Sequence, residues 1–112
     1  MTGGSASSLF GRLGRIEALV GLGRLPDARV QLEGMRAADR EMPPARLAAA
    51  RLALAEGKPG EAIAAVRPLT EGDGPKSVEV LALYGDALFD AGKIEASAAQ
   101  YDLALAQDAA SP

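Results

Sequence analysis

The chain has 112 residues, of which 48% are apolar but only 4% aromatic, and its net charge is −3. It contains neither Cys nor His, which excludes disulfides, thiolate nucleophiles, zinc sites with nitrogen or sulfur ligands and His general bases, so we expect no cofactor and no metal. No stretch reaches the roughly 20 apolar residues that a membrane-spanning helix needs.

Residues 1–8, Met-Thr-Gly-Gly-Ser-Ala-Ser-Ser, are predicted to be a flexible linker and do not resemble a signal peptide. From there on, apolar periodicity predicts no strand and six helices near 8–22, 26–40, 44–56, 59–70, 76–91 and 94–109. The first is the weakest, because each of its three glycines costs up to ~1 kcal/mol relative to Ala. Prolines mark the expected helix starts, at Pro26, Pro43, Pro44, Pro59 and Pro75. Pro68 is the exception and should bend or end the helix at 59–70, and the run at 72–75 is predicted to be a loop.

A pattern recurs three times along the chain. It begins at Gly23, Gly57 and Gly92, which are 34 and 35 residues apart. Each Gly is followed by a basic residue, by a small residue after five positions and by a larger one after nine; the last two are Ala28 and Leu32, Ala62 and Val66, and Ser97 and Tyr101. A Gly just past a helix end suits the left-handed conformation, so each should close a tight turn between two helices.

A helical hairpin repeated every 34 residues resembles the tetratricopeptide repeat family. The third unit matches best, with Gly85 as the small residue at a close helix crossing and with large packing residues at Leu81, Leu88 and Tyr101. In the first unit Ile16 stands where the family has a small residue. The resemblance implies an all-α fold of three tandem antiparallel hairpins stacked as a right-handed α-solenoid over residues 9–112, with repeats at about 9–42, 43–75 and 76–110. A generic Ala-rich helical bundle is the alternative.

The resemblance also implies a protein–protein interaction module, or scaffold, whose first helices line a concave groove that binds a peptide or helix of a partner. The expected lining residues are Leu13, Glu17, Val20, Leu47, Arg51, Leu54, Ala82, Asp86 and Phe89. Phe89 is the candidate anchor, and Glu17, Arg51 and Asp86 form a charged row that could set register. The alternative is that the charges only solvate a helix face and that Phe89 packs against a neighbouring helix.

The last predicted helix has an apolar stripe of Ala99, Leu103 and Ala106, where a further repeat would pack. A solenoid needs polar caps, so we expect either that the chain is part of a longer protein or that a second copy covers the stripe. Of these two, we favour a longer protein. Charge is uneven, with eight Arg and six acids up to Glu56 and four basic residues and nine acids from Gly57 onward; this is either ordinary surface variation or a means for the basic front half of one copy to meet the acidic back half of another. The alternative function is therefore a self-assembly module that forms homo-oligomers through its ends.

Other functions are not expected. The Arg residues are interleaved with acids and lack stacking aromatics, which argues against a nucleic-acid partner. Asp86 and Asp90, one turn apart, are the best carboxylate pair for acid–base chemistry, but they are predicted to be solvent-facing, so we expect no enzyme. The chain has no Asn, so it lacks the Lys, Asn and Arg clamp of the family's heat-shock co-chaperones. An Ala- and Arg-rich composition suggests a bacterial source, in either cytoplasm or periplasm.

Overall fold

The computed structural model describes residues 6–72 and 76–110. In chain order the helices are α1 (Ala6–Gly21), α2 (Leu25–Glu33), α3 (Ala37–Arg40), α4 (Pro43–Ala55), α5 (Pro59–Val66), the 3-10 helix η1 (Arg67–Thr70), α6 (Val78–Asp90) and α7 (Ile94–Ala110). These residues contain no strand, which confirms the all-α fold class.

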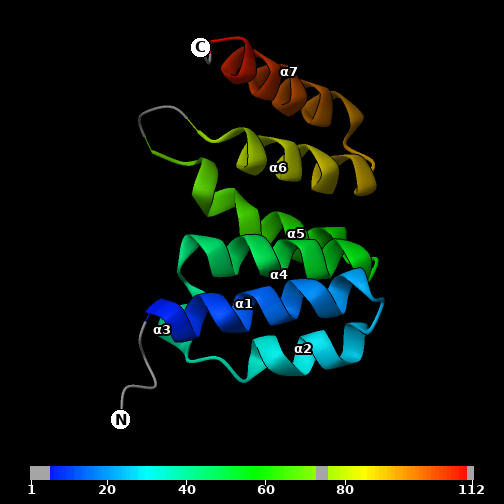
Figure 1. The fold of residues 1–112 in the computed structure, drawn as a ribbon. Helices are drawn as coiled ribbons and strands as arrows, with labels where there is room; N and C mark the ends of the chain where they lie inside the picture. Colours follow the sequence, from blue (N-terminus) through cyan, green and yellow to red (C-terminus); the bar gives the residue numbers. More distant parts are fainter. Residues whose placement is uncertain (1–5, 73–75, 111–112) are drawn as a thin grey trace.

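The helices are arranged as three hairpins stacked in chain order (Figure 1). Helix α1 pairs with α2, α4 with α5, and α6 with α7. Between hairpins, α4 contacts both α1 and α2, and α6 contacts both α4 and α5. Each hairpin thus covers an apolar face that its neighbour leaves open, and the stack is elongated, with extents of 44 × 30 × 22 Å.

The three repeat glycines close the hairpins as predicted. Gly23, Gly57 and Gly92 have φ angles of 77°, 75° and 82°, in the left-handed region that favours Gly. At each turn the Gly N–H and the next N–H donate back to carbonyls of the preceding helix; at the third turn these bonds run from Gly92 to Phe89 and from Lys93 to Leu88, both at 2.9 Å. This pair of bonds is the Schellman arrangement, which satisfies carbonyls that the helix end leaves open.

Prolines mark the helix starts, as expected. Pro26, Pro43, Pro44 and Pro59 lie in the first turn of α2, α4 and α5, whereas Pro75 lies outside the described residues. Pro68 ends α5 early, as predicted, because the chain continues only as the 3-10 helix η1.

Two boundaries differ from the prediction. Helix α1 begins at Ala6, so residues 6–8 of the predicted linker are helical, while residues 1–5 lie outside the described part. The helix predicted at 26–40 is broken after Glu33 into α2 and α3. Gly34 has a low helix propensity, and the break allows Met35, which is 5% exposed, to reach the core.

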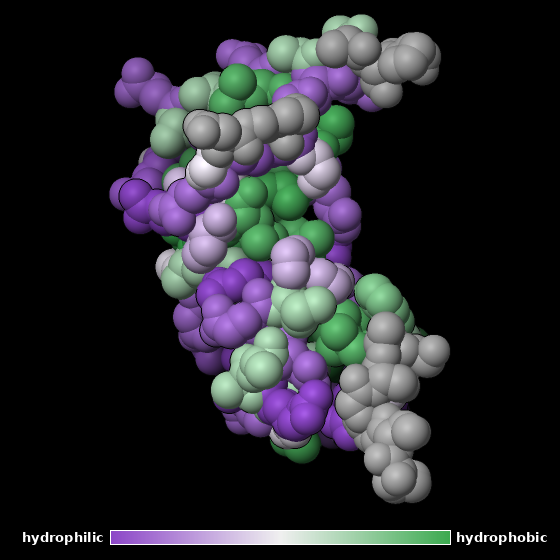
Figure 2. Space-filling view, turned by 90° about the vertical axis from the view of Figure 1, so that its left-hand side faces the viewer, coloured by the Kyte–Doolittle hydropathy of each residue, from purple (hydrophilic) through white to green (hydrophobic). Residues whose placement is uncertain are grey.

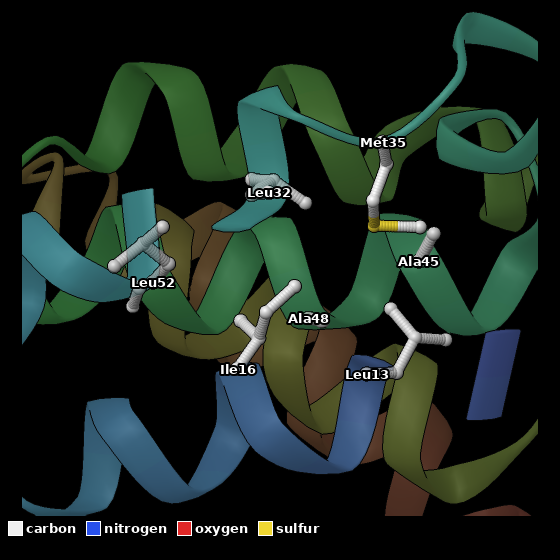
Figure 3. Close-up of a cluster of buried hydrophobic side chains, with 8 residues drawn as sticks. Leu13, Ile16, Leu32, Met35, Ala45, Ala48 and Leu52 are labelled. Carbon is white, nitrogen blue, oxygen red and sulfur yellow. The ribbon is translucent and has the colours of Figure 1, made fainter. Parts of the chain in front are cut away.

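Two clusters of buried side chains form the core, and α4 contributes to both. In the first, side chains of α1 and of the α2 region converge on α4 (Figure 3); its members are Leu13, Ile16, Ala28, Leu32, Met35, Ala45, Ala48 and Leu52. The second joins α4 and α5 to α6, through Ala50, Ala53, Ala62, Val66, Val80, Leu83 and Ala87. Because so many members are Ala, the helix backbones approach closely and small changes of volume are felt.

The close crossing within the third hairpin depends on Gly85. A Cβ at Gly85 would lie 2.7 Å from Cε1 of Tyr101 on α7. The hydroxyl of Ser97, which is 1% exposed, donates to the Gly85 carbonyl oxygen at 2.8 Å. The ring of Tyr101 and the hydroxyl of Ser97 therefore both hold α7 against α6 at Gly85.

An ion pair joins the first hairpin to the end of α4. Arg29 of α2 donates through Nε to Oε2 of Glu56 at 3.2 Å, and its Nη2 contacts Oε1 of the same carboxylate. The side chains are 24% and 12% exposed, so the pair is largely shielded from water. The hydrogen bond from Arg29 lowers the pKa of Glu56 below its ordinary value.

Glu56→Gln is expected to lower the free energy of unfolding at pH 7 by about 1–2 kcal/mol, because Arg29 loses its charged acceptor. The folded-state pKa of Glu56 is lowered, so this stabilisation is present above the unfolded pKa and is lost as pH falls through the folded value. Urea denaturation at neutral pH and at about pH 3 should show the difference between variant and parent shrinking in acid.

The control is Glu71→Gln, at an exposed carboxylate that forms no ion pair within residues 6–72 and 76–110. It should change stability by less than about 0.5 kcal/mol. A Glu56→Gln deficit of equal size at both pH values would contradict the assignment.

Candidate functional site

A hollow of about 280 Å³ lies on the first helices of the three hairpins. Its lining comes from α1, α4 and α6 and consists of Phe10, Leu13, Gly14, Glu17, Pro44, Leu47, Arg51 and Glu79. These eight residues are called the groove below. Four of them, Leu13, Glu17, Leu47 and Arg51, are predicted lining residues.

Arg51 joins the three hairpins within the groove. Its Nη1 donates to Oε2 of Glu17 on α1 at 2.8 Å, and its Nη2 pairs with the carboxylate of Glu79 on α6. The Arg51 side chain is 31% exposed, so the groove wall rather than bulk water surrounds most of it. Both of its terminal nitrogens are thus engaged by carboxylates of the chain itself.

Asp86, the third member of the predicted charged row, does not line the groove and does not pair with Arg51. Glu79, and not Asp86, pairs with Arg51 on α6. Asp86 lies seven residues further along, about 10 Å away at 1.5 Å per residue. Its carboxylate instead accepts a hydrogen bond from the hydroxyl of Tyr101 on α7.

Tyr101 holds the Asp86 carboxylate in place. Burial raises the pKa of Tyr101, and the hydrogen bond to Asp86 raises it further. The phenol therefore remains a proton donor at neutral pH. Asp86 itself is exposed, so its oriented carboxylate is open to a ligand.

The sequence prediction missed four groove residues, which are Phe10, Gly14, Pro44 and Glu79. All but Gly14 precede the first predicted groove residue of their helix by three positions, which are Leu13, Leu47 and Ala82. Residues three apart share a helix face, so extending the stripe by one turn toward each helix start would have found all three. Phe10 is the most prominent omission, with 59% of its surface exposed.

The other predicted lining residues lie outside the groove. Val20 and Leu54 are partly buried against the first and second core clusters, and Ala82 is also partly buried. Phe89 is 55% exposed and lies ten residues beyond Glu79, about 15 Å along α6. It is thus an accessible aromatic at the opposite end of that helix from the groove.

The predicted self-association stripe is open to solvent. Ala99, Leu103 and Ala106 are all exposed on α7, Leu103 to 52%. Leu105, which follows Leu103 by two positions in the sequence, is 66% exposed. The opposite side of α7 contains the buried Ser97 and Ala104. Helix α7 thus packs with one face and presents apolar side chains on the other.

Apolar surface is not confined to the groove and the stripe. Figure 2 shows a recessed apolar area in the upper half of the molecule, with hydrophilic residues on both sides.

A second hollow, also of about 280 Å³, lies between α1 and α2 and is lined by Arg15, Leu19, Arg24, Asp27, Val30 and Gln31. Two of its charges, Arg24 and Asp27, pair with each other at 2.7 Å.

Over residues 6–72 and 76–110, no helix is both long enough and apolar enough to cross a membrane. The same residues contain no group of three or more acidic side chains placed to hold a metal ion.

Comparison with known protein families gives a match in the second half of the chain. A model described as tetratricopeptide repeat matches residues 47–112, which include most of α4 and all of α5, α6 and α7. Comparison with curated proteins and with solved structures gives no match.

Proposed function

Because the chain belongs to the tetratricopeptide repeat family, whose domains mediate protein–protein interaction, we propose that it is a scaffold that binds a peptide or helix of a partner protein along its first helices. The observation that supports this most is that the groove draws side chains from all three hairpins. A surface shared by stacked repeats suits an extended ligand. The hollow's volume of about 280 Å³ leaves room for a few side chains of a polypeptide.

The proposed contact surface combines the groove with the rest of the same helix face. It consists of Leu13, Glu17, Val20, Leu47, Arg51, Leu54, Asp86 and Phe89 from the sequence prediction, together with Phe10, Pro44 and Glu79. Phe10 and Phe89 are its two exposed aromatics, one at each end. Exposed aromatics are the side chains that most often dominate binding energy at interfaces.

Phe89→Ala is expected to weaken partner binding at least about tenfold while the free energy of unfolding changes by less than about 0.5 kcal/mol. Stability should change little because Phe89 is 55% exposed and so contributes little to the core. The partner can be identified by placing a photo-crosslinking amino acid at Phe10 in the native cell, and its affinity for each variant measured by calorimetry.

Val30, which is 65% exposed on α2, is the matched control for both steps. A crosslinker at Val30 should not capture the partner, and Val30→Ala should bind it as the parent does. Unchanged affinity of Phe89→Ala would remove Phe89 from the site, and equal capture from both positions would contradict the groove proposal.

A second candidate is the self-assembly module. The exposed α7 stripe favours it, because Leu103, which is 52% exposed, presents apolar surface that a second copy could cover. A crosslinker at Leu103 would then yield a homodimer, and light scattering would show oligomers that salt dissociates. A monomer at high concentration would rule this candidate out.

A further inference from the structure

Charge is distributed unevenly over the face that contains the groove. Helix α6 has three acids, Glu79, Asp86 and Asp90, and no basic residue. Asp86 is two turns beyond Glu79, and Asp90 is one turn beyond Asp86. Within the described residues, neither Asp86 nor Asp90 forms an ion pair. A ligand that crosses α6 therefore meets two carboxylates that have no cationic partner among residues 6–72 and 76–110.

The single groove cation is not open to a ligand carboxylate. Arg51 is already engaged by Glu17 and Glu79, so an acidic ligand would have to displace one of them. The other Arg of α4, Arg46, donates to the Ala65 carbonyl at 3.2 Å and pairs with Glu41, and it does not line the groove. The groove thus has one cation, which Glu17 and Glu79 already pair with, and the far end of α6 adds the two carboxylates of Asp86 and Asp90.

An aromatic ring lies among these acids. Phe89 is more than half exposed, with Asp86 one turn before it and Asp90 next to it in sequence. A guanidinium or ammonium group can stack on such a ring while it pairs with a neighbouring carboxylate. Tyr101 fixes one of the two carboxylates, so part of this arrangement exists before any ligand binds.

We propose that the occupant of this surface is a basic amphipathic segment of a partner protein. Its apolar side chains pack on Phe10, Pro44 and Leu47, and its Arg or Lys side chains lie over Phe89 and pair with Asp86 or Asp90. This inference rests on the proposed function and specifies the ligand's chemistry.

The test uses two fluorescein-labelled synthetic peptides of equal length, one built of Leu and Arg and the other of Leu and Glu. Fluorescence anisotropy with the full chain should show the Leu/Arg peptide binding at least about tenfold more tightly, with an affinity that falls as salt rises. Equal or tighter binding of the Leu/Glu peptide would overturn the proposal.

A pair of double variants separates the α6 carboxylates from net charge. Asp86→Asn with Asp90→Asn should raise the Kd of the Leu/Arg peptide about tenfold. Asp102→Asn with Asp108→Asn removes the same charge from exposed positions on α7 and should raise it less than about twofold. An equal loss in both double variants would mean that net charge alone attracts the peptide, and the proposal would be wrong.

Two further substitutions distinguish failure of this inference from failure of the proposed function. If the Leu/Glu peptide binds and both Leu47→Ala and Phe89→Ala weaken it, the groove is the binding site but the ligand is not basic. If neither substitution affects either peptide, both proposals are wrong.

Discussion

Replacing Gly85 by Ala is expected to lower the free energy of unfolding by about 2–3 kcal/mol, although Ala is the better helix former. The new methyl group would lie 2.7 Å from Cε1 and 2.9 Å from Cδ1 of Tyr101. The ring can move away only by giving up its hydrogen bond to Asp86. A shift of α7 instead would stretch the bond from Ser97 to the Gly85 carbonyl. Urea denaturation of variant and parent measures the loss.

Gly11→Ala is the matched control for this substitution. Nothing lies within 4 Å of a Cβ at Gly11, so the change should raise stability by up to about 1 kcal/mol through helix propensity alone. Combining Gly85→Ala with Tyr101→Leu should recover part of the loss, with a coupling energy of at least about 1 kcal/mol. Strictly additive effects of Gly85→Ala and Tyr101→Leu would show that the ring is not what the methyl group meets.

Ile16→Ala is expected to cost about 2–5 kcal/mol, although Ala is the kind of residue that the repeat pattern calls for at this position. Ile16 is 0% exposed and packs in the first core cluster beside Leu32 and Leu52. Truncation leaves a cavity between α1, α2 and α4 that the surrounding helices can close only in part. The loss is measured by thermal and urea denaturation.

Leu105→Ala removes a comparable side chain from a position that is 66% exposed and should change stability by less than about 0.5 kcal/mol. A cost below about 1 kcal/mol for Ile16→Ala would contradict this account. It would mean that the first hairpin closes up around a small residue as the third one does.

Gly85 and Ile16 occupy the same position of their repeats, and their neighbours explain the difference. The facing second helix has Tyr101 in the third hairpin and the smaller Leu32 in the first. The middle hairpin has Ala50 with Val66, both 0% exposed. The largest of the facing residues, Tyr101, thus lies opposite the smallest, Gly85, and it is the pair rather than either residue that fits the space between two helices.

Much of the fold could be predicted from sequence because its determinants are local. A left-handed turn requires Gly, and a helix start tolerates Pro, so the hairpins and most helix starts were predictable. The break between α2 and α3 was not, because it depends on burial of Met35 against residues distant in sequence. The periodicity of apolar residues along a helix does not predict that contact.

Repeat spacing indicated that Glu17 and Arg51 lie close together, and the two side chains do form an ion pair. It did not indicate that Glu79 is the second partner of Arg51. Side chains on a helix lean toward its N-terminal end, and Arg is long enough to reach a residue well before its repeat equivalent, which is Glu79. The spacing of the repeats predicts where the helix backbones lie, but it does not predict how far along the next helix a long side chain such as that of Arg51 extends.

Helix α4 contributes side chains to both core clusters, and this affects how the chain folds. Stacked repeats behave as a row of elements coupled to their nearest neighbours, and such a row could in principle open one hairpin at a time. Here each core cluster has one wall in α4, through Ala48 and Leu52 on one side and Ala50 and Ala53 on the other. Loss of that helix would expose both cores together. We therefore expect the middle hairpin to form early in folding and the hairpins on either side of it to unfold together.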